Sequence, residues 1–417
     1  MPSLKVLICG GGCAGPALAY WLANTGHNVT IVERFPVLRA TGAQIDLRGR
    51  GIEVVKRMGL NGIIRSKLVD EEGIAFVDLN ENIGATVLAN KSGKGAQTLT
   101  SEYEIMRGDL IRIFYDATHH NVKYIFGTTV DDFEQDDQSV TVRFSDGSSD
   151  TYDLLIGADG QGSRIRKAIL PPNSLEPYRK LGMHMAYWFV PRDETDDNLS
   201  RSYLSPGGRM IMRRSHNETE TQVYFFLKDD SPELSSIHRA SVETQKELWT
   251  QKFQDAGWQT SRFLEGMKTT NNWYCQEVVQ VQTNTWYKGR VALLGDASSC
   301  PSPFSGMGTT ASLVGAYVLA GEINRHADDL PRALANYDEV FRPFVNEVQN
   351  INMSLMKLAI PETRWGITIL HFIVWVACLL RIPELASRFS KERDGDWKLP
   401  DYPELSQKGE ENGNLKN

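Results

Sequence analysis

The sequence predicts an α/β fold in which a parallel-sheet domain is interrupted by an inserted mixed β-sheet and followed by C-terminal helices. The chain opens with a strand, a glycine turn, a helix and a second strand over residues 4–33. Strands rich in aromatic residues and methionine fill its middle, and a short apolar strand at 290–294 precedes another long helix. Strands that alternate with helices predict a parallel sheet, whereas consecutive middle strands predict a separate one.

Length and composition limit the possible functions. The chain has 417 residues, which is enough for two or three domains, and a net charge of -7, which argues against a nucleic-acid partner. Its five cysteines are odd in number and form no Cys-x-x-Cys, so we expect neither a disulfide framework nor a metal site. An apolar strand follows the N-terminus without a signal peptide, and we therefore expect a reducing, cytoplasmic location.

The first strand leads into Gly10-Gly11-Gly12-Cys13-Ala14-Gly15, which satisfies G-x-G-x-x-G and opens a helix. In such a motif Gly10 permits the tight turn and Gly12 lets the backbone approach a pyrophosphate. Gly15 allows close packing of helix on strand. The free N–H groups and positive dipole end of the helix would then face the phosphates.

The second strand ends at Glu33, about twenty residues after the motif, where an acid accepts hydrogen bonds from ribose hydroxyls. Motif, strands, helix and terminal acid together predict a dinucleotide site of the Rossmann type. They do not choose between NAD and FAD.

The remaining elements are predicted from hydrophobic periodicity and turn residues. A helix begins near Arg107, and an Asp146-Gly147 hairpin joins Val140–Phe144 to Tyr152–Ile156. Further predicted strands are Val122–Phe126, Met183–Val190, Arg209–Arg214, Gln222–Lys228 and Arg290–Leu294. Further predicted helices are Ser241–Phe253, 309–326, 331–357 and 365–380.

Two later stretches carry the argument for FAD. Asp153–Gly160 and Gly289–Ala297 are apolar strands that end in an acid, at Asp159 and Asp296. With the glycine motif, and in this order over about residues 4–350, they resemble the class A FAD-dependent aromatic hydroxylases, the p-hydroxybenzoate hydroxylase-like group. Within it the sequence is similar to tetracycline-inactivating and fungal secondary-metabolite monooxygenases.

The resemblance implies a division of the chain into domains. An FAD-binding domain would comprise 1–178 and 273–350, interrupted by a substrate-binding sheet domain at 179–272. C-terminal helices would follow at 351–390. The polar segment 391–417 would be a disordered tail.

The resemblance also implies cofactor contacts. Glu33 and Arg34 would contact the adenosine half of FAD, Arg107 would lie along the cofactor, and Asp296 would hydrogen-bond the ribityl chain. Asp159 would support FAD and assist NAD(P)H binding. Residues beside the flavin ring would be Ala43, Pro303, Gly306, Met307 and Gly308. The sequence departs from the family pattern at Ser298 and Ser299, where Ala and His are usual.

The implied activity is insertion of one oxygen atom of O₂ into an aromatic or polycyclic substrate. NADPH or NADH would reduce the flavin, and O₂ would add at its C4a atom. No catalytic residue is identifiable. A flavin-dependent halogenase and a non-catalytic escort protein like the Rab GDP-dissociation inhibitors share the fold and remain alternatives, although no Trp-x-Trp-x-Ile-Pro segment is present.

Substrate contacts are predicted in the middle strands. Aromatic residues there would cover an aromatic substrate, and cationic residues would polarise it. The alternative is that the aromatic residues belong to the ordinary hydrophobic core. The candidates are Tyr187, Arg209, Arg213, Tyr224 and Phe226.

The apolar run 365–380 is about 24 Å long as a helix, shorter than a bilayer's ~30 Å hydrocarbon core. A membrane span is therefore not expected. The run would be a core helix, or would touch a membrane surface or a dimer partner.

Overall fold

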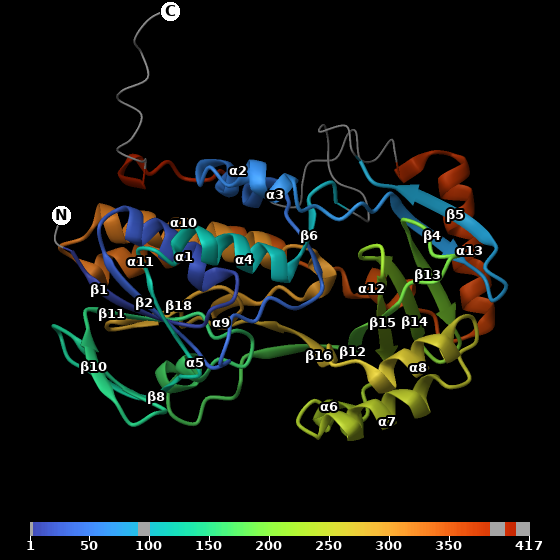
Figure 1. The fold of residues 1–417 in the computed structure, drawn as a ribbon, viewed down its shortest axis with the longest axis horizontal. Helices are drawn as coiled ribbons and strands as arrows, with labels where there is room; N and C mark the ends of the chain where they lie inside the picture. The colour runs from blue at the N-terminus through green and yellow to red at the C-terminus, as the bar shows by residue number, and fades with distance from the viewer. Residues whose placement is uncertain (1–2, 91–100, 384–396, 406–417) are drawn as a thin grey trace, which may run out of the picture.

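The computed structural model describes residues 3–90, 101–383 and 397–405. Its first sheet is the parallel sheet that the sequence predicts, and Figure 1 shows it beneath a layer of helices. β17 is the antiparallel edge strand, and the other five strands run parallel. In spatial order the strands are β17 (Tyr287–Lys288), β18 (Val291–Leu293), β11 (Leu154–Gly157), β1 (Lys5–Cys9), β2 (Asn28–Glu33) and β7 (Lys123–Phe126).

Both faces of this sheet are covered, which explains why β1 is an unbroken apolar run. Val6 and Ile8 pack under the helical layer, and Leu7 and Cys9 pack toward an antiparallel meander and α5 (Arg164–Ile169). The helical layer contains α1 (Ala14–Asn24), α2 (Gly49–Arg57), α3 (Asn61–Arg65), α4 (Arg107–Thr118), α10 (Gly308–Arg325) and α11 (Leu330–Gln349). The meander is β8 (Val130–Gln135), β9 (Val140–Phe144) and β10 (Ser149–Tyr152).

The second sheet has seven strands and lies at the other end of the molecule (Figure 1). One face packs against α6 (Pro232–Ile237), α7 (Val242–Phe253) and α8 (Thr260–Thr269). The other face turns toward α12 (Met353–Ala359), α13 (Arg364–Leu379) and the loop before α10. The strands in order are β16 (Tyr274–Val281), β12 (Tyr178–Pro191), β15 (Glu220–Lys228), β14 (Arg209–Ser215), β13 (Leu199–Ser205), β4 (Gly73–Val77) and β5 (Ile83–Leu88).

The second sheet draws on more of the chain than residues 179–272. β4 and β5 come from the first 178 residues, and β16 follows residue 272. They join the sheet through long-range contacts, in which β4 pairs parallel with β13 and β16 pairs antiparallel with β12. A two-stranded ribbon, β3 (Gln44–Asp46) with β6 (Glu104–Met106), adjoins this sheet. The domain division itself stays a prediction.

The predicted strand Tyr152–Ile156 is wrong as a single element. Residues Ser149–Tyr152 pair with β9, and Leu154–Gly157 enter the parallel sheet. The chain changes sheets at Asp153, whose carboxylate accepts a hydrogen bond from the backbone N–H of Lys5 (2.6 Å). The predicted helix 331–357 is likewise two helices, α11 and α12, since Asn352 caps the second through the N–H groups of Ser354 and Leu355.

The predicted disorder of 391–417 is wrong for 397–405; the remainder lies outside the described residues. Trp397 donates its indole N–H to the carbonyl of Val340 (3.0 Å), and Tyr402 is 2% exposed. The segment is polar in composition, but its few apolar side chains fit the gap between α2, α10 and α11.

Candidate functional site

The site lies at the carboxyl edge of the parallel sheet. β1, β2, β11 and β18 end there together, and the chain leaves each of them in a loop that carries predicted site residues. Ligands bind at this edge in open α/β sheets because the loops there diverge.

The glycine turn after β1 has the geometry that the motif predicts. Gly10 has φ of 121°, and a Cβ there would overlap the carbonyl oxygen of Ala158. A Cβ at Gly15 would overlap the carbonyl of Gly10, whereas one at Gly12 would meet only the Arg107 guanidinium at 3.3 Å. No side chain caps α1 and no acid lies in its first turn, so its N–H groups can serve a phosphate.

Glu33 ties the turn to β2. Its carboxylate accepts hydrogen bonds from the backbone N–H of Gly11 (2.7 Å) and of Phe35 (3.1 Å). Each oxygen keeps a further lone pair, and ribose hydroxyls can therefore still donate to it. Arg34 is exposed beside it and lies over the ring of Phe35.

A cation and an acid face one another across the site. Arg107 begins α4, and its backbone N–H donates to the carbonyl of Ala43 (3.0 Å). Asp296 begins α9 (Asp296–Ser299). Burial raises the pKa of Asp296, and the positive charge of Arg107 opposes that rise. For Arg107 burial acts to lower the pKa, but neighbouring groups that include Asp296 raise it above its ordinary value.

The loop before α10 contains two residues with positive φ. Ser302 has φ of 78° and Gly306 has φ of 64°, with the short helix η1 (Pro303–Ser305) between them. Met307 is buried and donates its backbone N–H to Ser305 Oγ (3.0 Å). Gly308 begins α10, which has neither a side-chain cap nor an acid in its first turn.

This set of donors and acceptors fits FAD. The N-terminus of α1 suits the pyrophosphate, Glu33 and Asp296 suit the hydroxyls of ribose and ribityl chain, and the N-terminus of α10 suits the carbonyl side of the flavin ring. Gly306 adjoins Asp46 of β3, since a Cβ there would lie 3.3 Å from Oδ2. The Ala43 loop and the 303–308 loop are therefore neighbours.

Asp159 has a local task in this structure. Its carboxylate accepts hydrogen bonds from Ser163 Oγ (2.6 Å) and from the backbone N–H of Arg164 (2.7 Å), at the start of α5. The predicted contact of Asp159 with the cofactor stays a prediction.

Three of the five substrate candidates lie on the sheet face that turns toward this site. The ring of Phe226 lies 5.8 Å from that of Phe304, which is in η1, and Tyr187 lies 5.7 Å from Tyr224. The Tyr224 hydroxyl accepts from the backbone N–H of Gln44 (3.3 Å). These contacts join the second sheet to both loops of the site.

Sequence reasoning missed Tyr274, whose ring lies 5.0 Å from Tyr187. It is the first residue of β16, outside the range predicted to bind substrate. Only the pairing of β16 with β12 brings it there, and no local sequence pattern indicates that pairing.

Arg209 and Arg213 do not lie on that face, so the structure does not bring these two candidates together with the other three. Strand alternation places them on the α7–α8 side, opposite to Met210 and Met212. Arg209 pairs with Asp255 (2.5 Å), and the fully buried Arg213 pairs with Asp196 (2.7 Å).

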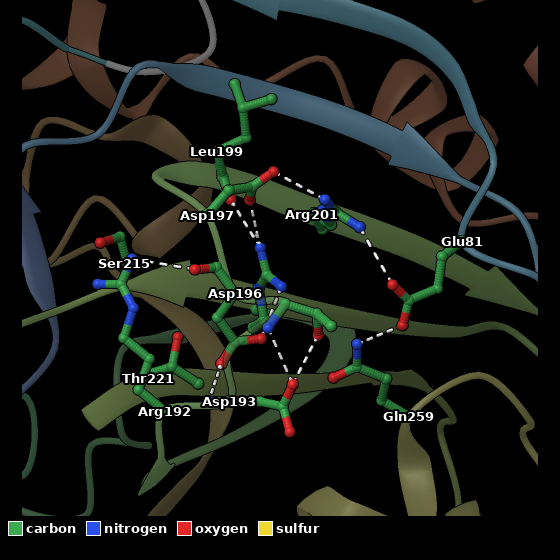
Figure 2. Close-up of polar contacts among 12 residues, drawn as sticks. Glu81, Arg192, Asp193, Asp196, Asp197, Leu199, Arg201, Ser215, Thr221 and Gln259 are labelled. Atoms are coloured by element: carbon green, nitrogen blue, oxygen red, sulfur yellow. Dashed lines mark hydrogen bonds and ion pairs between the residues drawn. The ribbon is translucent and has the colours of Figure 1, made fainter. Parts of the chain in front are cut away.

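Arg213 belongs to a network at the far end of the second sheet. Figure 2 shows Arg201 between Asp197 and Glu81, with Gln259 on the other side of Glu81. These contacts join the β4–β5 turn, β13 and the start of α8. The network therefore holds the sheet together rather than serving a ligand.

Within the described residues no group of three or more histidine, cysteine or acidic side chains could hold a metal ion. No single described helix is long and apolar enough to cross a membrane.

A comparison with protein families matches residues 3–350 to the FAD binding domain family. The chain belongs to that family. It is an FAD-dependent monooxygenase, because relatives with this name align over nearly its whole length. The FAD-dependent monooxygenase asL4 of Sarocladium schorii is 41% identical, covering 97% of this chain and 99% of its own. The flavin-dependent monooxygenase eupH of Phoma sp is 38% identical, over 96% and 98%.

Solved structures agree with the fold of this monooxygenase. The tetracycline destructase Tet(51) is 31% identical with a TM-score of 0.76, over 96% of this chain and all of the other. Klebsiella pneumoniae HpxO, complexed with FAD and uric acid, is 22% identical with a TM-score of 0.71 over 91% and 95%, and shows the shared fold. The halogenase and escort alternatives receive no support from these relatives.

Proposed function

We propose that this monooxygenase consumes NADPH or NADH and inserts one oxygen atom of O₂ into an aromatic or polycyclic small molecule. The observation that carries the proposal is the aromatic and methionine-rich face of the second sheet, which meets the loop expected beside the flavin ring through Phe226 and Phe304. A flat apolar substrate would lie against this face, beside the contact of Phe226 with Phe304.

FAD, when bound, supplies the electron transfer and oxygen activation. The chain's own residues bind and orient it: the α1 N-terminus and Glu33 at the adenosine half, Arg107 and Asp296 along its length, and Gly308 at the ring. The positive dipole end of α10 would stabilise negative charge on a reduced ring.

The substrate side would position a carbon atom and exclude water. Tyr187, Tyr224 and Tyr274 form an aromatic wall next to Arg107, and Met185, Met210 and Met212 lie on the same sheet face. Relatives support the substrate class: the fungal enzymes fit secondary metabolism, and the tetracycline destructases are named for a polycyclic molecule.

The test is to load purified protein with FAD, add NADPH or NADH, and measure their oxidation with a panel of phenols and polycyclic ketones. We expect a flavin spectrum, faster oxidation with one class of compound, and mass-spectrometric incorporation of one ¹⁸O atom from ¹⁸O₂. A yellow protein that oxidises neither nucleotide with any compound would contradict the proposal.

A further inference from the structure

Helix α13 presents an apolar face that no other described part of the chain covers. None of its residues is buried, and Trp365 is 80%, Phe372 62% and Leu379 65% exposed. These residues share one stripe, since spacings of seven return to the same side of an α-helix. The other exposed apolar residues of the stripe and its edges are Ile369, Ile373, Trp375 and Leu380.

The opposite face of α13 is anchored. Ile367 and Leu370 pack on the methionine and aromatic cluster of the second sheet. Figure 1 shows the helix beside β5, at the end of the molecule remote from the parallel sheet. The helix is therefore fixed by one side, and no described residue covers the other side.

The apolar surface continues onto the edge strand. Ile83 and Leu88 of β5, and Leu79 in the turn before it, are each about half exposed or more. Neither residues 82–90 nor residues 365–380 include an aspartate, glutamate, lysine or arginine. The surface formed by α13 and β5 is thus uncharged as well as apolar.

Arginines mark both ends of the helix, and a tryptophan lies in its first turn. Arg364 precedes Trp365, Arg381 follows Leu380, and both arginines are exposed. Tryptophan and arginine at the limits of an apolar stripe are the pattern that lipid headgroups select, because rings lie at the interface and cations meet phosphates.

We propose that the α13–β5 surface docks on a lipid bilayer, with α13 lying flat in the headgroup region. Its 16 residues would extend about 24 Å, short of a ~30 Å hydrocarbon core. A second copy of the chain fits less well, since protein interfaces carry polar groups that fix the register. This stripe offers few such groups, the hydroxyl of Thr368 and the indole N–H groups of Trp365 and Trp375. Docking would set the substrate-facing sheet beside a source of apolar compounds.

The experiment is co-sedimentation of the full chain with vesicles of phosphatidylcholine alone, or with 30% phosphatidylserine. The test variant is Ile369→Glu/Phe372→Glu, and the matched control is Leu175→Glu, which changes an exposed leucine in the loop between α5 and β12. We expect wild type and control to bind, with tighter binding to phosphatidylserine, and at least about tenfold weaker binding by the test variant. Arg364→Ala/Arg381→Ala should lose only the phosphatidylserine preference.

Light scattering coupled to size-exclusion chromatography measures whether this face instead binds a second copy of the chain. If wild type ignores both vesicles and forms a dimer that the test variant abolishes, the face is an interface between copies and the proposal is overturned. A monomer that ignores vesicles overturns it too. Unchanged FAD binding in the test variant shows that it is folded, so that vesicle binding is judged independently of the catalytic reaction.

Discussion

At the scale of single residues, the cofactor site depends on a few acids and one arginine. Asp296 and Arg107 attract each other by charge. Asp296 also has a side-chain hydrogen bond with Cys300, and Arg107 has one with Cys13. Both side chains lie among the loops where the resemblance places the cofactor.

We predict that Asp296→Ala weakens FAD binding by about 10- to 100-fold, the effect of losing a hydrogen bond to a charged group. The change in flavin fluorescence on titration with apoprotein measures the dissociation constant. Asp255→Ala, at an exposed carboxylate, should leave it unchanged. Equal affinity in both variants would remove Asp296 from the site.

Arg209 and Arg213 of β14 differ in the burial of the aspartate that each one pairs with. We predict that Arg213→Ala lowers the free energy of unfolding by about 2–3 kcal/mol, because the buried carboxylate of Asp196 loses one of its two arginine partners and keeps only Arg262. Arg209→Ala should cost only about 1–2 kcal/mol, since Asp255 is exposed. Urea unfolding measures both. A weaker substrate affinity without destabilisation would instead restore them as substrate residues.

At the scale of elements, the N-termini of two helices form part of the candidate cofactor site, and one end of the second sheet contains a group of ion pairs. The helices α1 and α10 both begin without a side-chain cap, and this is where the phosphate and the flavin ring are expected. The second sheet, by contrast, is held at its far end by the loop from β12 to β13, whose carboxylates bind arginines from β14 and α8.

That loop predicts a dependence of stability on pH. Burial alone would raise the pKa of Asp196, but hydrogen bonds from Arg262 and Asp193 and the charge of Arg213 hold it below its ordinary value of 3.8. A carboxyl whose pKa is lower in the folded state stabilises fully above 3.8 and progressively less as pH falls through the folded value.

The stabilisation of wild type over Asp196→Asn should therefore be greatest at neutral pH and shrink below pH 3.8. Urea unfolding between pH 7 and pH 2.5 measures it, with the exposed Glu218→Gln as control. A difference that grows as the pH falls would show that Asp196 is not held ionised.

At the scale of the whole molecule, the C-terminal segment closes the helical layer. The Tyr402 ring packs on Gly321 of α10, and its hydroxyl donates to Glu322 (2.7 Å). The carbonyl of Pro400 accepts from Arg57 of α2 (3.1 Å). Residues 397–405 thus connect α2 and α10, which flank the cofactor site.

We predict that Tyr402→Ala costs about 3–5 kcal/mol of stability, the usual loss for removing a buried ring. Tyr402→Phe keeps the ring and should cost about 1–2 kcal/mol for the lost hydrogen bond. Thermal unfolding of the FAD-loaded enzyme compares them. If both variants unfold like wild type, the segment does not hold the helices together.

The sequence by itself determined the cofactor half of the protein. Strand, glycine turn, helix and Glu33 are local features, and steric exclusion of any Cβ at Gly10 acts within a few residues, so β1, α1 and β2 lie where the pattern predicts. Only the tertiary structure decided which face of each middle strand meets the site. Arg213 and Met212 are neighbours in β14, yet helices distant in sequence bury the first on one side while the second faces Phe304 and α13. The contribution of Tyr274 and the packing of Tyr402 likewise depend on long-range pairing, which no local pattern encodes.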